Sequence, residues 1–191
     1  MLGAFGCLTV TAKDLNTVSS SIDHPEDSVD YAEDSIRLPP ARRTFKSPTG
    51  NYILVISNGD GWESVTAIGE LIEVKSGKQV LLWRKSFPQR YGPRYAVVNS
   101  SGRVLLFDEW VNVKSPYALM LFDTDGRSIK HYGFEELQRE LDIPIDQIVD
   151  RANFGWWIMT PPRLEESGNH AVVEVGGTTI TIDLENGNIT Q

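Results

Sequence analysis

The 191-residue chain is poor in cysteine, in histidine and in long apolar runs, and each shortage excludes a class of structure. A single cysteine, Cys7, excludes an internal disulfide, a Cys-x-x-Cys redox pair and a cysteine-rich zinc site. No apolar run reaches the roughly 18 residues that a membrane-spanning helix needs, so we expect no transmembrane span. Only three histidines occur, and no Gly-x-Ser-x-Gly motif marks a serine nucleophile.

Clustered positive charge is also scarce. The chain has 18 Lys and Arg against 26 Asp and Glu, a net charge of -8. The densest basic spot, Arg37 with Arg42, Arg43 and Lys46, follows an acidic stretch, and we expect it to balance that stretch. A nucleic-acid-binding face needs a basic stripe, so we predict no nucleic-acid partner. The hydrophobic content of 40% is typical of a globular domain.

Residues 1–12 are small, apolar and uncharged, and they resemble the back half of a secretion signal that lacks its basic beginning. Cleavage before Cys7 would make that cysteine a lipid anchor, as in bacterial lipoproteins. Ala4 and Phe5 depart from the Leu-like and small residues that the lipobox of that family requires at their places. A second cleavage site follows Ala12, and a plain cytosolic N-terminus is the alternative. Extracytoplasmic and cytoplasmic locations therefore stay equally open.

Residues 13–40 are dominated by acids and serines, and their apolar residues occur singly. Such a segment buries too little apolar surface to offset its ordering entropy, so we predict a flexible acidic tether. Leu38-Pro39-Pro40 closes it with a stretch that cannot be helical. We place the folded domain at residues 41–191.

One strand–turn–strand–loop–strand–turn–strand pattern occurs three times in residues 41–191. The first turns of the three copies end at Gly50, Gly102 and Gly168, and an apolar run follows each glycine. The second turns end at Gly77, Gly126 and Gly187. Short segments rich in Val, Ile, Leu, Thr and Tyr between glycine turns predict an all-β, mainly antiparallel domain. We place the first strand of the third copy at residues 155–159.

A helical insertion of about residues 133–152 separates the second and third copies. Phe134, Leu137 and Leu141 are spaced i, i+3 and i+7, which is typical of one buried helix face. Asp142-Ile143-Pro144 ends this helix, and residues 145–152 favour a second short helical turn.

A four-stranded antiparallel unit with glycine turns at these two places resembles a β-propeller blade. The resemblance covers residues 41–191 and implies three blade-like sheets. Closed propellers use about four to eight blades, so three units imply an open assembly or a ring completed by a homodimer. A β-sandwich built from hairpins is the alternative fold. Propellers host both enzymes and docking scaffolds, so the resemblance implies no particular activity.

Two aspartates offer a weak metal-binding pattern. Asp123 and Asp125 alternate before Gly126 as in calcium loops, but the third donor and the distant glutamate of such loops are missing. An aspartate-glycine hairpin explains the same residues. We predict no metal and no cofactor.

Tryptophans form the strongest binding candidates. Trp62 and Trp110 occupy comparable places just after the second strand of the first two copies, in the loops that lead to the third strands. Exposed aromatic residues are typical of binding hot spots. We therefore predict a contact site that comprises Trp62, Trp110 and their loop neighbours Asp60, Glu63, Glu109 and Asn112.

These features favour a non-catalytic binding or scaffold domain that contacts a protein or a small ligand, tethered to an envelope if the chain is exported. The alternative is a hydrolase acting on a glycoside or an ester, because Asp108 and Glu109 stand beside Trp110. Adjacent strand residues point to opposite faces, however, so the two acids cannot line one cleft while the strand continues. We predict no catalytic residue.

Overall fold

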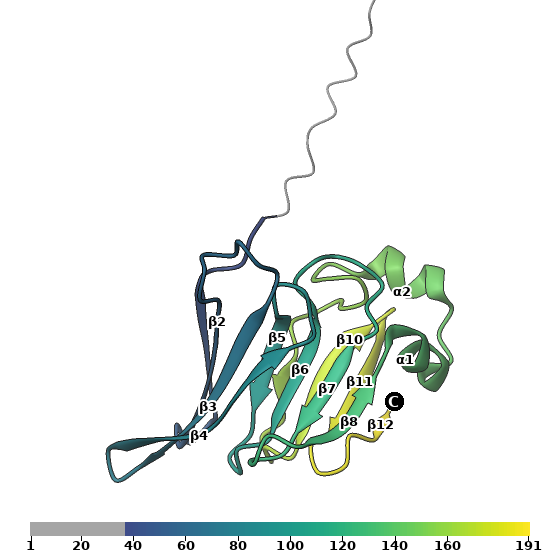
Figure 1. Ribbon diagram of the computed structural model, residues 1–191. Helices are drawn as coiled ribbons and strands as arrows, with labels where there is room; N and C mark the ends of the chain where they lie inside the picture. The colour runs from purple at the N-terminus through teal and green to yellow at the C-terminus, as the bar shows by residue number, and fades with distance from the viewer. Residues whose placement is uncertain (1–36) are drawn as a thin grey trace, which may run out of the picture. The chain divides into compact units, whose positions relative to one another are not determined.

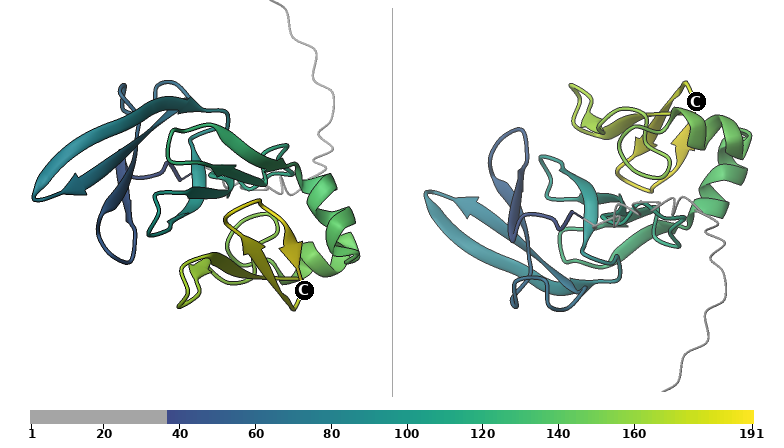
Figure 2. Two further views of the ribbon diagram at one scale, coloured as in Figure 1. Left: turned by 90° about the horizontal axis from the view of Figure 1, so that it is seen from below. Right: turned by 90° about the horizontal axis from the view of Figure 1, so that it is seen from above.

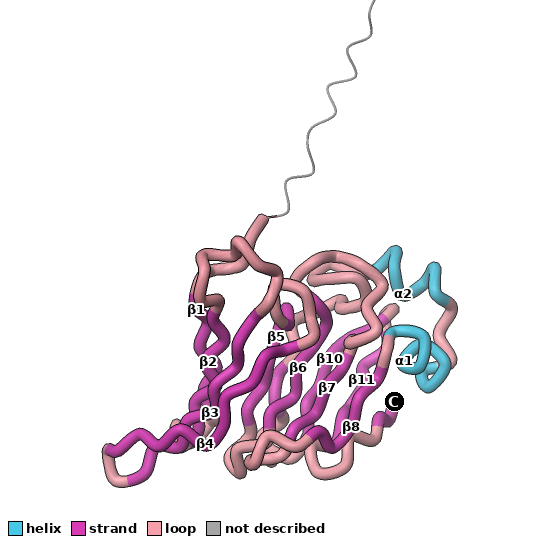
Figure 3. The backbone as a smooth tube through the Cα atoms, viewed as in Figure 1, coloured by secondary structure: helices cyan, strands magenta, loops and turns pink. Residues whose placement is uncertain are grey.

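The computed structural model describes residues 37–191, so the predictions for Cys7 and for residues 1–36 lie outside the described residues. Within the described part the chain forms twelve strands in three antiparallel four-stranded sheets and two short helices (Figures 1 and 3). The first sheet contains β1 (Arg42–Lys46), β2 (Tyr52–Ser57), β3 (Ala67–Lys75) and β4 (Lys78–Phe87). The second contains β5 (Pro93–Val98), β6 (Val104–Glu109), β7 (Leu119–Phe122) and β8 (Ser128–Tyr132). The third contains β9 (Arg163–Leu164), β10 (His170–Val175), β11 (Thr178–Asp183) and β12 (Ile189–Thr190).

The threefold repeat predicted from the glycine turns is confirmed. Gly50, Gly102 and Gly168 lie between the first and second strands of their sheets with φ of 73°, 80° and 70°. Only glycine adopts this left-handed conformation at no steric cost. The three glycines therefore form equivalent turns in the three sheets. In each sheet the strands are paired in sequence order, as expected for a meander.

The second sheet lies between the other two and contributes to both hydrophobic cores (Figure 2). Alternation along β6 explains this, because Leu105 and Phe107 face the core shared with the third sheet, and Val104 and Leu106 face the core shared with the first. Trp157, Val173 and Ile182 are members of the former core, and Leu54, Leu71 and Trp83 of the latter. The whole of β6 is therefore buried.

Only one face of the first and third sheets belongs to these cores. The strand register shows which residues lie on the other, outer faces. On the first sheet one row across the strands is Lys46, Ile53, Ile72 and Leu81, and the next is Thr44, Val55, Glu70 and Arg84. On the third sheet the outer face carries Arg163, His170, Val172, Glu174, Thr179, Thr181, Asp183 and Thr190. The outer face of the third sheet is thus almost entirely polar.

The predicted insertion forms α1 (Phe134–Leu141) and α2 (Ile145–Arg151), which connect the second sheet to the third. Phe134, Leu137 and Leu141 are at most 2% exposed, which confirms the predicted buried face of α1. Neither helix of the described part is long and apolar enough to cross a membrane.

The predicted first strand of the third copy at residues 155–159 is wrong. The backbone N–H groups of Asn153 and Phe154 both donate to the carbonyl of Ile158, which closes a loop instead of a strand. Gly155 has φ of 132°, and Trp157 is fully buried in the core. The strand forms later, at Arg163–Leu164, directly after two prolines.

Candidate functional site

In each sheet the first strand begins, and the second strand ends, at the same end of the sheet. Four loops lie at this end. We call this end the loop edge; its loops are residues 58–66, 88–92, 110–118 and 152–162. Both tryptophans of the predicted site lie here, between second and third strands, as the sequence indicated. Asp60, Glu63 and Asn112 also lie in these loops, and Glu109 is the last residue of β6, directly before the 110–118 loop.

Trp62 is a core residue. Its exposed fraction is 8%, and its ring lies 5.8 Å from the ring of Tyr91. The side-chain oxygen of Asn58 accepts the backbone N–H groups of Asp60 (2.9 Å) and Trp62 (2.6 Å), and these bonds turn the loop so that the indole faces inward. The exposure that we assumed for Trp62 is therefore wrong.

Glu109 is also buried, with 3% exposure. Its carboxylate accepts hydrogen bonds from the hydroxyl of Ser115 (2.6 Å) and the backbone N–H of Arg90 (3.2 Å), so it ties two loops together. Asp60, Glu63 and Asn112 are exposed, as expected. Hydrogen bonds to Asp60, led by that of Ser64, lower the pKa of its carboxyl.

Trp110 is half-buried, and two arginines lie close to its ring. The Cζ atoms of Arg43 and Arg94 lie 4.9 Å and 5.6 Å from its ring centroid, within the range of cation–π attraction. Its indole N–H donates to the backbone carbonyl of Arg37 at 2.6 Å. Its backbone N–H donates to the carbonyl of Gly92 at 2.9 Å, which brings residues 90–94 against the ring.

We define the Trp110 cluster as Trp110 with Arg37, Arg43, Arg90 and Arg94. Arg43 donates through Nη1 to the carbonyls of Pro93 (2.7 Å) and Arg94 (3.2 Å), and Arg94 donates through Nη2 to the carbonyl of Trp110 (2.5 Å). Within residues 37–191, the Nε and Nη2 atoms of Arg43 and the Nε atom of Arg94 are buried without a hydrogen-bond partner. Burial, and secondarily the charge of Arg94, lower the pKa of Arg43 to about 10.

Asp108 lies under this cluster and is fully buried. Its Oδ2 accepts the backbone N–H of Trp156 at 3.0 Å, and its backbone has φ of 52°. Desolvation raises the pKa of this carboxyl to about 7. A Cβ atom at Gly155 would lie 2.5 Å from Oδ2, so the 152–162 loop closes tightly over Asp108.

The sequence did not reveal Arg43, Arg94 or the burial of Asp108 as features of this site. Two signals were present: each arginine lies in the first strand of its copy, and Asp108 continues the apolar run Val104–Phe107. Neither signal specifies that segments some fifty residues apart meet at Trp110. Because Asp108 and Glu109 have at most 3% exposure, neither carboxyl is open to a substrate in this structure.

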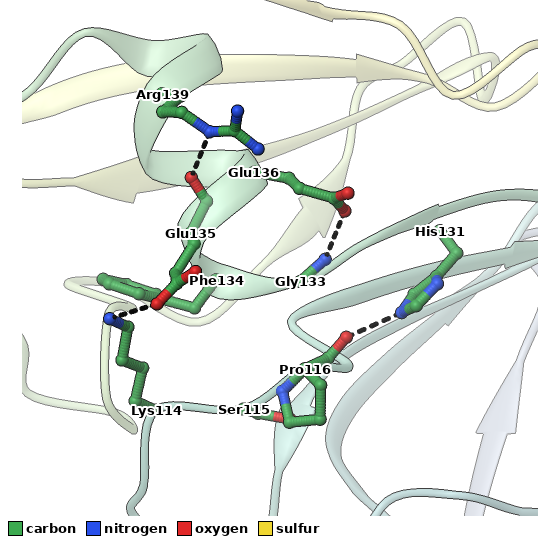
Figure 4. Close-up of a pocket in the computed structure, with 9 residues that line it drawn as sticks. All are labelled: Lys114, Ser115, Pro116, His131, Gly133, Phe134, Glu135, Glu136 and Arg139. Carbon is green, nitrogen blue, oxygen red and sulfur yellow. Dashed lines mark hydrogen bonds and ion pairs between the residues drawn. The ribbon is translucent and has the colours of Figure 1, made fainter.

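A cavity lies elsewhere, between the 110–118 loop and α1 (Figure 4). It measures about 520 Å³ and is lined by Lys114, Ser115, Pro116, His131, Gly133, Phe134, Glu135, Glu136 and Arg139. Its charged groups largely engage one another or the backbone: Lys114 pairs with Glu135 at 2.8 Å, and Glu136 accepts the Gly133 N–H at 3.0 Å. His131 Nε2 lies 2.7 Å from the carbonyl of Pro116. Ser115 also lines the cavity, and its hydroxyl donates to the buried carboxylate of Glu109 at 2.6 Å.

Asp123 and Asp125 build a hairpin turn. Asp123 Oδ1 accepts the backbone N–H of Arg127 at 2.7 Å, and Asp125 lies 3.8 Å from the Arg127 guanidinium. Across the described residues, no group of three or more His, Cys, Asp or Glu side chains is arranged to hold a metal ion.

No protein-family model matches the chain, and no curated protein matches it. Among solved structures, a europium-containing methanol dehydrogenase aligns with 79% of this chain at 11% identity and a TM-score of 0.40. The chain spans about 25% of the length of that protein. Similarity at this level says nothing about the function of this chain.

Proposed function

We propose that residues 41–191 form a non-catalytic binding domain whose partner docks on the loop edge around Trp110. The observation that carries this proposal is a half-exposed indole held in place by hydrogen bonds, with two arginines close to its ring. Trp and Arg are the residue types most enriched at binding hot spots. An aromatic ring already held by neighbours loses little side-chain entropy when a partner covers it.

The arrangement of the sheets supports a propeller-like architecture for this domain. Each sheet is a four-stranded meander, and the first strands β1 and β5 of successive sheets adjoin, as the inner strands of blades do. Charged and threonine side chains on the outer face of the third sheet favour an open three-blade unit over a ring completed by a second chain. Loops at one end of such a unit form a continuous surface for a partner.

Site-specific photo-crosslinking in cells tests the proposed function. A photoreactive residue in place of Asn112, which is exposed on the same loop as Trp110, is expected to form an adduct with a partner. Asn186 is the matched control, because it is also exposed but lies in the turn between β11 and β12, away from the loop edge. Adducts at both positions, or at neither, would contradict the proposal.

A further inference from the structure

Arginines without acidic partners gather at the loop edge of a chain whose net charge is -8. Arg37 and Arg90 are exposed, and Arg43 and Arg94 are partly exposed. Within residues 37–191 none of these four takes part in an ion pair. The cluster is thus a local concentration of positive charge, which is offset in part at Arg94 by the neighbouring Asp108.

The acids nearest to the cluster do not neutralise it at the surface. Glu109 is buried and uses its oxygens on Ser115 and the Arg90 backbone. Asp108 is buried and accepts the backbone N–H of Trp156; it interacts with the charge of Arg94 without forming an ion pair, and it is not exposed at the surface. Asp60 and Glu63 are exposed on the neighbouring 58–66 loop, and Asp60 accepts the backbone N–H of Ser64 at 3.1 Å. In the described part of the chain neither of them pairs with an arginine of the cluster.

The side chains that a ligand would meet are basic and aromatic together. The Arg90 side chain is exposed; in Arg94 the Nη2 atom donates to Trp110 and the Nε atom is buried, which leaves Nη1 for a ligand. A guanidinium group presents a planar fork of donors that matches a carboxylate, and such charge-assisted bonds are about twice as strong as neutral ones. Tyr91 and Trp110 lie beside the arginines and are each partly exposed. Aromatic surface next to guanidinium groups suits a peptide, which brings apolar atoms together with its charges.

We infer that the partner presents an acidic peptide segment, whose carboxylates bind Arg90 and Arg94 while its apolar atoms cover Trp110. This inference rests on the proposed function, since it names the chemistry of the partner at the same site. A nucleic acid carries one negative charge per phosphate along its whole length and needs an extended basic stripe, whereas the arginines of the Trp110 cluster form one basic spot in a chain whose net charge is -8. A short acidic segment fits a basic spot of this kind.

Titration calorimetry on the full chain tests the inference with an octaglutamate peptide as the probe. We expect octaglutamate to bind, and octaglutamine, inorganic phosphate and oligothymidylate to bind at least about tenfold more weakly. Binding of octaglutamate should weaken as salt rises, because the charges lie at the surface. Failure of octaglutamate to bind, or equal binding of any of the other three compounds, would overturn the inference.

Variants locate the binding to the cluster. Arg90→Gln and Arg94→Gln are each expected to weaken octaglutamate binding several-fold, and the double variant about tenfold or more. Arg127→Gln, an exposed arginine in the β7–β8 turn, is the matched control and should leave affinity unchanged. If Arg94→Gln fails to fold, Arg90→Gln alone decides, because that side chain is exposed.

The two proposals fail separately. A crosslink at position 112 without octaglutamate binding would leave the docking surface in place and disprove the acidic peptide. Absence of the crosslink would disprove docking at the loop edge, whatever the peptide does. Equal loss of binding in Arg127→Gln and Arg90→Gln would show non-specific attraction and overturn the inference.

Discussion

At the scale of single residues, Asp108 is the group whose ionisation the fold opposes most strongly. It has no exposed surface, and desolvation raises its pKa from 3.8 to about 7. Hydrogen bonds from the backbone of Trp156 and Glu109, and the charge of Arg94, act in the opposite direction without cancelling this effect. A folded-state pKa above the unfolded one means that the folded protein holds this proton more tightly.

The pH dependence of stability follows from that difference. The stabilisation that the protonated Asp108 gives to the folded state is fully present below the unfolded pKa of 3.8. It is lost as the pH rises through the folded-state pKa of about 7. The side chain of the Asp108→Asn variant stays neutral at every pH. We therefore expect the unfolding free energy of this variant to fall less than that of the wild type between those two pH values. Urea denaturation at a series of pH values measures it, with the exposed Glu140→Gln as control. An unchanged pH profile in Asp108→Asn would contradict the assignment.

The two loop tryptophans should respond differently to truncation. Trp62→Ala removes a ring with 8% exposure and should cost about 3–5 kcal/mol of unfolding free energy. Trp110→Ala removes a half-buried ring, so we expect a smaller loss of stability together with loss of the crosslink at position 112. Chemical denaturation of both variants provides the comparison. Equal destabilisation would show that Trp110 is a core residue like Trp62.

Sequence reasoning placed both tryptophans in the correct loops but could not distinguish their burial. The turn chemistry that sets the loop positions is local, and glycines and polar residues reveal it. Burial depends on Asn58, which turns Trp62 inward, and on Arg43 and Arg94, which approach Trp110 from other strands. Contacts between distant segments leave no periodic pattern in the sequence.

At the scale of elements, the 152–162 loop takes the place of the strand that apolar composition predicted. Its apolar residues read as a strand, yet Trp157 enters the core from a loop and Gly155 has φ of 132°. The first strand of the third sheet is only Arg163–Leu164. Apolar spacing in the sequence correctly predicts most of the other strands and both helices, because their apolar residues are buried in a core.

Gly155 is the position where this loop is most sensitive to substitution. An added Cβ would lie 2.5 Å from Asp108 Oδ2, and the φ of 132° is unfavourable for any other residue. We expect Gly155→Ala to destabilise the fold by about 1–3 kcal/mol. Gly59→Ala is the matched control, because it has no atom within 4 Å of the added Cβ and is exposed. Similar melting temperatures for the two variants would contradict this account.

At the scale of the whole described unit, the three sheets differ in how their faces are used. The second sheet contributes both of its faces to cores, whereas the first and third each contribute one face. The outer face of the first sheet has an apolar row of Ile53, Ile72 and Leu81 beside charged residues, and that of the third is polar. The assembly therefore ends in two unlike surfaces.

A ring completed by a second chain would bury both surfaces, and this consequence makes the oligomeric state testable. In such a ring the outer face of the third sheet of one chain would pack on the outer face of the first sheet of the other. Thr179, Thr181 and Glu174 would then lose their contact with water, and the isoleucines of the first sheet offer them no hydrogen bonds. We therefore expect the chain to be monomeric, with a mass near 21.3 kDa by light scattering after size exclusion. Thr181→Glu places a charge at the centre of this face and should leave that mass unchanged. A dimeric mass that Thr181→Glu converts to the monomeric one would establish the completed ring instead.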